Sequence, residues 1–138
     1  MPGASVEFVT RSRQVLRALD RMQTTRMQMA CIHLQNEIKR TLSGPRSGKK
    51  YRVPGTKRYY TASAPGEPPA VRTGRLRNSI KYKLVRGFMR AKGEVGSSLD
   101  YAAQLEFGTS KMAPRPYLRP TYEKERQTIK RILAGKVP

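Results

Sequence analysis

This chain of 138 residues contains one cysteine, one histidine and no tryptophan. A single cysteine, Cys31, cannot form a disulfide within the chain. One cysteine and one histidine also cannot supply the ligands of a usual structural zinc site. The sequence has no apolar run of membrane-spanning length, and its first residues lack the apolar core of a signal peptide. We therefore expect no metal, no cofactor and no membrane partner.

Acidic residues are also scarce, and this argues against an enzyme. The few carboxylates are scattered, and His33, the only histidine, has no nucleophile motif near it. The segment GPRSGKK at residues 44–50 has the wrong glycine spacing for a phosphate-binding loop. We expect no catalytic residues, and we expect His33 to lie on a helix without a partner.

What the chain has in excess is positive charge. Twenty-nine basic residues oppose nine acidic ones, which gives a formal net charge of +20. Such an imbalance destabilises a fold by self-repulsion unless a polyanion or an acidic partner lies close. No acidic residue occurs between Glu37 and Glu67, and nonspecific DNA is our expected partner for this region, with a solvated face as the alternative. The candidates to face DNA are Lys49, Lys50, Arg52, Lys57 and Arg58.

The sequence pattern predicts one α+β domain over residues 1–138. Apolar residues at helical spacing predict a long N-terminal helix over 11–42, with Cys31 buried on its apolar side. Residues 43–72 are rich in glycine, proline and serine and are expected to form an extended basic loop. Within it, Lys49–Val53 and Arg58–Thr61 are expected to pair as a short ribbon around Pro54-Gly55.

Tyrosines alternate with basic residues in this ribbon, and two interpretations remain open. Tyr51, Tyr59 and Tyr60 could stack on bases, or they could anchor a strand that pairs with a neighbour. No recognised nucleic-acid motif surrounds them, so general electrostatic attraction to the DNA backbone is favoured.

Residues 73–118 are expected to hold a small antiparallel sheet and a docking arm. Thr73 is expected to cap a turn, and the alternation from Ile80 to Leu84 predicts a half-buried strand. Gly87 suggests a bulge, and Lys92-Gly93 suggests the turn into the partner strand. A last helix over 119–135 should begin near Pro120 and stop at Gly135.

The segment 101–120, YAAQLEFGTSKMAPRPYLRP, reads as a short helix followed by a stiff arm. Asp100 is expected to cap the helix and Gly108 to end it. Prolines then fix φ and remove N–H donors, so the arm should be extended and its apolar side chains buried, on its own domain or on a neighbouring subunit. The expected docking residues are Leu105, Glu106, Phe107, Gly108, Pro114, Arg115, Pro116, Tyr117 and Leu118.

The segment 64–80, APGEPPAVRTGRLRNSI, and the segment 101–120 together resemble the small neck and tail-completion proteins of long-tailed bacteriophages. The resemblance covers residues 64–133, with all blocks in the family's order and spacing. The matching features are Thr73-Gly74-x-Leu76-Arg77-x-Ser79-Ile80, Tyr101-Ala102, Leu105-Glu106-x-Gly108 and Pro114-x-Pro116-Tyr117-Leu118-x-Pro120.

This resemblance implies a structural virion protein without enzyme activity. It would form a ring at the head–tail junction, of six subunits or alternatively twelve, around the DNA channel. Its other partners would be the head-connector or stopper proteins, the tail-terminator or tail-tube proteins, and nonspecific DNA. The protein would assemble in the host cytoplasm and end in the neck of the virion.

Two other functions compete with this one. A basic nucleic-acid-binding protein of the cellular, ribosomal-like type fits the charge, but the docking arm and the lack of a binding motif argue against it. An enzyme such as a nuclease would need a cluster of carboxylates or a histidine site, which the sequence does not contain.

Overall fold

The computed structural model of the chain describes residues 2–64, 66–70, 74–87 and 89–136. Four helices and two antiparallel hairpins confirm the predicted α+β class. The elements are α1 (Pro2–Ser43), β1 (Lys50–Arg52), β2 (Tyr59–Thr61), α2 (Arg75–Ser79), β3 (Lys81–Gly87), β4 (Arg90–Gly96), α3 (Ala102–Phe107) and α4 (Arg119–Leu133).

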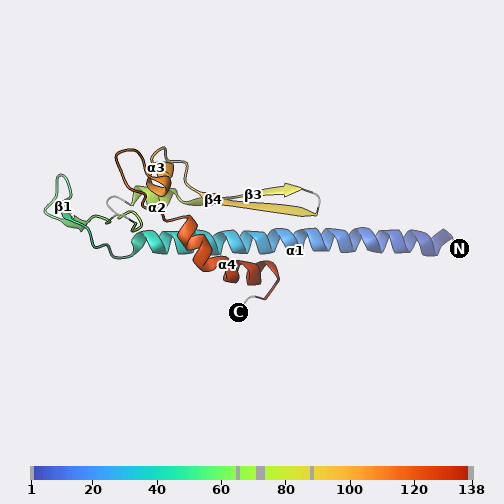
Figure 1. Cartoon of the computed structure of the whole chain (residues 1–138). Helices are drawn as coiled ribbons and strands as arrows, with labels where there is room; N and C mark the ends of the chain where they lie inside the picture. Colours follow the sequence, from blue (N-terminus) through green and yellow to red (C-terminus); the bar gives the residue numbers. More distant parts are fainter. Residues whose placement is uncertain (1, 65, 71–73, 88, 137–138) are drawn as a thin grey trace.

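Helix α1 is the element on which the rest of the chain packs. The β3–β4 hairpin and α4 lie along it, and its N-terminal part runs on beyond both (Figure 1). At about 1.5 Å per residue, this helix is ~60 Å long, which exceeds the width of so small a domain. It begins at Pro2, earlier than the predicted residue 11. Every side chain from Arg13 to Leu19 is exposed, so the described part of the subunit does not cover this section of the helix.

The hydrophobic core is small and lies at the other end of α1. Ile38 and Leu42 of α1, Ile80 before β3, and Tyr117 of the arm are fully buried against one another. The partly buried residues packed around them are Leu34, Leu76, Val95, Leu105 and Leu118. A core of this size agrees with the 37% hydrophobic content of the chain.

The β3–β4 hairpin corrects two predictions about glycines. Gly87 pairs in register with Arg90, so no bulge occurs there. Gly93 pairs with Leu84 in the middle of the hairpin, so the predicted turn at Lys92-Gly93 is wrong. The half-buried strand predicted around Ile80–Leu84 is confirmed by the alternation of exposed and half-buried residues along β3.

Gly93 is needed for close packing instead of a turn. A Cβ at this position would overlap the Sγ atom of Cys31 and would lie 2.9 Å from the Sδ atom of Met27, both on α1. The hairpin therefore packs directly on α1 at a position without a side chain. Cys31 is buried there as predicted, and burial raises the pKa of its thiol.

The predicted basic ribbon is confirmed as the β1–β2 hairpin. Tyr51 pairs with Tyr60 in antiparallel register, and Gly55 turns the chain with a φ of 76°. The hairpin projects past the C-terminal end of α1, at the end of the molecule opposite the N-terminus (Figure 1).

The helix ends agree with the sequence in part. Helix α4 starts with Pro120 in its first turn and stops before Gly135, which has a φ of 79°, as predicted. Asp100 is not the cap of α3, because Tyr101 occupies that position and no side chain caps the helix. Thr73, the expected cap before α2, lies outside the described residues, and Gly74 takes the N-cap position. No helix in the described part of the chain has the length and apolar character needed to cross a bilayer.

Candidate functional site

The docking arm packs onto its own subunit through Tyr117. This side chain is 0% exposed, and its hydroxyl donates a hydrogen bond to the carbonyl oxygen of Ala102 at 3.2 Å. Burial, with a smaller contribution from the neighbouring Glu106, raises the pKa of Tyr117 to about 12. The sequence left open whether Tyr117 is buried in its own domain or against a neighbouring subunit. In the structure it lies in the core of its own domain.

Glu106 connects helix α3 to the arm. Its buried carboxylate accepts the backbone N–H groups of Tyr117 at 2.8 Å, Leu118 at 3.0 Å and Arg119 at 3.0 Å. These donors lie at the start of α4, where backbone N–H groups have no partner within the helix and a negative charge is favoured. Glu106 was predicted as a docking residue, and the docking it performs here is within the subunit.

Gly108 and Arg115 close the loop between α3 and the arm. Gly108 has a φ of 78°, and a Cβ there would lie 2.8 Å from the backbone nitrogen of Pro114. The backbone N–H of Arg115 donates to the carbonyl of Leu105 at 2.7 Å. The Arg115 guanidinium donates to the carbonyl and the hydroxyl of Ser63, at 3.0 Å and 2.5 Å. The arm is thus attached both to α3 and to the segment that follows the β1–β2 hairpin.

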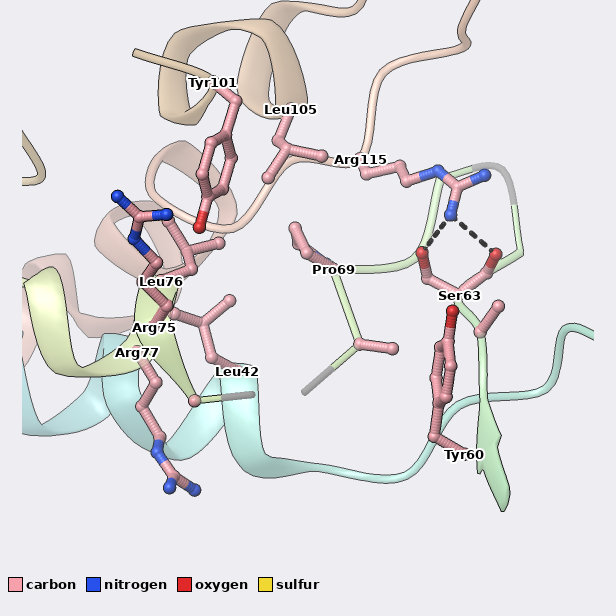
Figure 2. A pocket seen from close by; sticks show the side chains of 13 residues that line it. Leu42, Tyr60, Ser63, Pro69, Arg75, Leu76, Arg77, Tyr101, Leu105 and Arg115 are labelled. Carbon is pink, nitrogen blue, oxygen red and sulfur yellow. Dashed lines mark hydrogen bonds between the residues drawn. The ribbon is translucent and has the colours of Figure 1, made fainter. Parts of the chain in front are cut away.

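A recess of about 450 Å³ lies beside this attachment (Figure 2). Leu105 of α3 and Tyr101 directly before this helix point into it from one side, and the paired Arg115 and Ser63 form the other (Figure 2). Its described lining residues include no aspartate, glutamate or histidine. These residues could contact an apolar side chain or an anion, but they offer no general base.

Among the predicted docking residues, Phe107 is the large apolar side chain left for a partner. It is 79% exposed, at the C-terminal end of α3. It borders an apolar groove of about 580 Å³ whose walls come from α1, β4, α3 and the start of α4. The groove is lined in part by Leu34, Val95, Ala103, Leu118 and Tyr122. An exposed aromatic residue beside an apolar groove is the usual composition of a protein–protein contact.

The five predicted DNA-facing residues lie together on the β1–β2 hairpin or directly beside it. All five are exposed, and none takes part in the ion pairs found among the described residues. Tyr59 is 68% exposed on the same hairpin, whereas the rings of Tyr51 and Tyr60 contact each other with centroids 5.9 Å apart. The hairpin therefore presents an uncompensated positive surface.

Arg46 lies within the same basic region, but its side chain holds the fold together, a role that sequence reasoning missed. Its guanidinium donates to five backbone carbonyls, at distances of 2.6–3.0 Å. The acceptors are Thr41, Gly44, Pro45, Pro68 and Pro69. These bonds tie the end of α1 to the proline-rich segment before α2, so Arg46 is not available to DNA. Nothing in the basic run of the sequence distinguishes Arg46 from the neighbouring lysines and arginines.

Glu67 holds the other end of this segment. Its carboxylate accepts hydrogen bonds from the hydroxyl and the backbone N–H of Ser47 and from the N–H of Ala64. These bonds lower the pKa of Glu67 to about 2. Arg46 and Glu67 together fix how the basic hairpin leaves the domain.

The prediction that His33 has no partner is wrong. Its Nε2 atom lies 2.8 Å from the Oε2 atom of Glu125, which joins α1 to α4. The two residues are 92 positions apart, and only the packing of α4 along α1 brings them together. No cluster of three or more potential metal ligands occurs in the described part of the chain.

The chain was compared with protein families, curated proteins and solved structures. Residues 10–108 match the family described as "Bacteriophage HK97-gp10, putative tail-component". No curated protein and no solved structure matches the chain. The family match covers most of α1, both hairpins, α2 and α3, and it ends at Gly108, before the arm. The chain therefore belongs to the HK97 gp10-like family of bacteriophage tail components, which are structural proteins of the virion.

Proposed function

We propose that this protein forms a ring at the head–tail junction of a phage and joins the head connector to the tail around the DNA channel. The observation that carries the proposal is the exposed Phe107 beside an apolar groove, in a chain of a tail-component family. An exposed aromatic side chain beside an apolar groove can bind a second copy, and a head-to-tail contact whose rotation closes produces a ring. The ring would have six subunits, with twelve as the alternative.

The charge of the chain supports a position around DNA. Six copies of a +20 subunit would sum to about +120, a charge that needs a polyanion nearby. The β1–β2 hairpin presents exposed lysines and arginines without acidic partners, and it projects from the body of the subunit (Figure 1). In the proposed ring these hairpins face the lumen or the next ring, and they bind phosphates without sequence preference.

The proposed mechanism consists of docking and electrostatics, with no bond made or broken. The whole chain acts as one domain, in which the arm and Glu106 keep the α3 region rigid. Phe107 and the groove then supply subunit contacts, while the ring's two faces contact the connector or stopper on one side and the tail terminator or tail tube on the other. Assembly takes place in the host cytoplasm.

The exchange of Phe107 tests the ring. Burying this side chain at an interface is worth about 1.5–3 kcal/mol per contact, so Phe107→Ser should convert rings to smaller species in light scattering. Tyr59→Ser is the matched control, because it removes another highly exposed aromatic side chain, from the hairpin, and should leave the ring intact. Tyr117 is unsuitable for this test, since its loss would affect the core of the subunit.

Two outcomes would contradict the proposal. A wild-type protein that stays monomeric at high concentration, with and without DNA, would argue against a ring built from this chain alone. Rings that persist in the Phe107→Ser variant would place the subunit contact elsewhere. Images of virions that carry a labelled copy would then decide whether the protein lies at the neck.

A further inference from the structure

A second apolar surface runs along α1, on the side opposite to the core. Its members follow one another at alternating spacings of three and four residues, and all of them are exposed. Five members are apolar and one, Thr25, is polar; in order they are Val15, Ala18, Met22, Thr25, Met29 and Ile32. We call these six residues the outer stripe. The exposed fractions of its four large members lie between 39% and 57%.

The elements that the structure describes leave this stripe uncovered. Helix α4 contacts α1 on one flank, through His33 and Glu125. The β3–β4 hairpin contacts another, where Gln28 donates to the hydroxyl of Tyr82 at 3.3 Å and Gly93 packs on Cys31. The part of the stripe before Met22 lies on the section of α1 that runs beyond both elements (Figure 1).

The spacing of the stripe is that of a helix-binding seam. Apolar residues at alternating spacings of three and four have a period of 3.5 residues, which keeps them on one line facing a partner helix. A helix face that only contacts solvent needs no such regular spacing of apolar residues. A face buried within the subunit would not be exposed along its whole length. The stripe therefore suits a single helix laid along α1.

The charges beside the stripe determine which helix fits. In heptad terms its flanking positions hold no acidic residue: Gln14, Arg21 and Gln28 on one side, and Leu19, Arg26 and His33 on the other. His33 is already paired with Glu125 of α4, so the positive charges beside the stripe are those of Arg21 and Arg26. Asp20 is the one acidic residue in the sequence from Arg13 to Asn36, and it does not lie on these flanks. Its Oδ2 atom lies 3.9 Å from the Nη2 atom of Arg86 on the β3–β4 hairpin. Flanking charges of one sign select a partner of the other sign.

A second copy of this chain does not provide that partner. Two parallel α1 helices would bring Arg21 of one copy against Arg26 of the other, and like charges across a seam disfavour pairing. An antiparallel pair would gain no ion pair between the flanks, because these positions hold no acidic residue. Helix α4 is no better suited. Its five basic residues Arg119, Lys124, Arg126, Lys130 and Arg131 outnumber Glu123 and Glu125.

We propose that the outer stripe is the docking site for an amphipathic helix of a different protein, with an apolar seam flanked by aspartate or glutamate. That this protein is another component of the virion rests on the proposed function above. The chemistry of the helix follows from the stripe alone. Binding would also neutralise part of the positive charge of α1.

The test uses the full chain and three synthetic probes labelled for fluorescence anisotropy. The first is a heptad-repeat peptide with leucine and isoleucine in the seam and glutamate on both flanks. The second has the same composition in scrambled order, and the third carries lysine in place of glutamate. Only the first should bind at physiological salt, with a gain of helical signal in circular dichroism.

Two variants locate the binding on the stripe. Met22→Glu combined with Met29→Glu should weaken binding of the acidic peptide by at least about tenfold. Val85→Glu combined with Tyr59→Glu makes the same change in net charge at exposed positions off α1, and should change binding much less. Met22→Gln with Met29→Gln keeps the charge constant and should also weaken binding, provided that its thermal unfolding matches the wild type.

Several outcomes would overturn the proposal. Equal binding of the scrambled acidic peptide would mean that net charge alone attracts it. Unchanged binding in both methionine double variants would place the site elsewhere. A fall in oligomer size in these variants would make a second copy of the chain the occupant of the stripe. Failure of the Phe107→Ser test with normal peptide binding would count against the ring and leave the stripe as the binding site.

Discussion

The carboxylate of Glu106 accepts the backbone N–H of Tyr117 at 2.8 Å, across eleven residues of sequence. This bond holds the arm where the Tyr117 ring completes the core with Ile38, Leu42 and Ile80. Two sequence blocks, the one around Glu106 and the proline-rich arm, are thus parts of one structural device. It leaves Phe107 facing outward while the residue before it is buried.

Glu106→Gln should lower the free energy of unfolding by about 2–4 kcal/mol. A glutamine offers one acceptor oxygen, so it cannot serve the three N–H groups that the carboxylate binds, and its own NH₂ group would face donors. Urea denaturation measures the change. Glu123→Gln on the exposed face of α4 is the control and should stay within about 0.5 kcal/mol of the wild type. Equal effects of the two changes would show that Glu106 does not hold the arm.

Tyr117 should make the fold sensitive to alkali. Its pKa is raised from 10.0 to about 12 in the folded state, so its contribution to stability is complete below pH 10 and is lost as the pH rises towards 12. The unfolded chain releases this proton at a lower pH than the folded chain does. The difference between the two pKa values corresponds to a loss of roughly 2–3 kcal/mol of stability. Unfolding curves over this pH range should show the loss in the wild type.

The Tyr117→Phe variant provides the comparison for that alkaline loss. It should be about 1 kcal/mol less stable at neutral pH, since the carbonyl of Ala102 loses its donor. It should then lose less stability than the wild type between pH 10 and 12. An identical alkaline loss in both proteins would assign the effect to other groups.

Gly93→Ala should destabilise the domain by about 1–3 kcal/mol, because the added methyl group would overlap the Cys31 thiol and crowd Met27. Gly96→Ala on the same strand has open space around its new Cβ, so it should be neutral or slightly stabilising. Thermal unfolding of the pair measures the difference. If both variants unfold alike, the hairpin does not pack on α1 at Gly93.

Arg46→Lys should loosen the segment that connects α1 to α2. A lysine has three donors on one nitrogen and cannot reach the five carbonyls that the guanidinium binds, so the local loss should be about 1–3 kcal/mol. Faster hydrogen exchange at the N–H groups of Ser47, Ala64 and Glu67 would report it. Arg58→Lys on the exposed hairpin should leave these rates unchanged, and equal rates in all three proteins would contradict the role of Arg46.

Neutralising the hairpin should weaken DNA binding and flatten its salt dependence. Each lost phosphate contact should reduce the slope of log K against log salt by about 0.9, because fewer counterions are released. The test variant replaces five basic residues of the hairpin with glutamine: Lys49, Lys50, Arg52, Lys57 and Arg58.

A charge-matched control separates the hairpin from net charge. The same exchange at five exposed residues of the C-terminal segment removes as many charges: Lys124, Arg126, Lys130, Arg131 and Lys136. Its salt slope should stay closer to that of the wild type. If the two variants behave alike, DNA responds to the total charge of the subunit and the hairpin has no special part.

Local rules allowed several elements to be predicted from the sequence. The hairpin around Pro54-Gly55, the strand after Ile80 and the limits of α4 at Pro120 and Gly135 follow from turn chemistry, period and capping. Each of these signals depends on residues within a few positions of one another. The site was predicted less completely, because the arm residues were found but their partners were not.

The sequence by itself determined the charge, the class of fold and the position of the arm, since composition and short-range pattern carry that information. Only the tertiary structure decided that Gly93 serves packing and not a turn, because a glycine permits both and the contact with Cys31 spans two elements. It also decided that Arg46 binds carbonyls and that His33 meets Glu125. Those pairings depend on which faces of α1 the other elements cover, and the period of a single helix does not specify its neighbours.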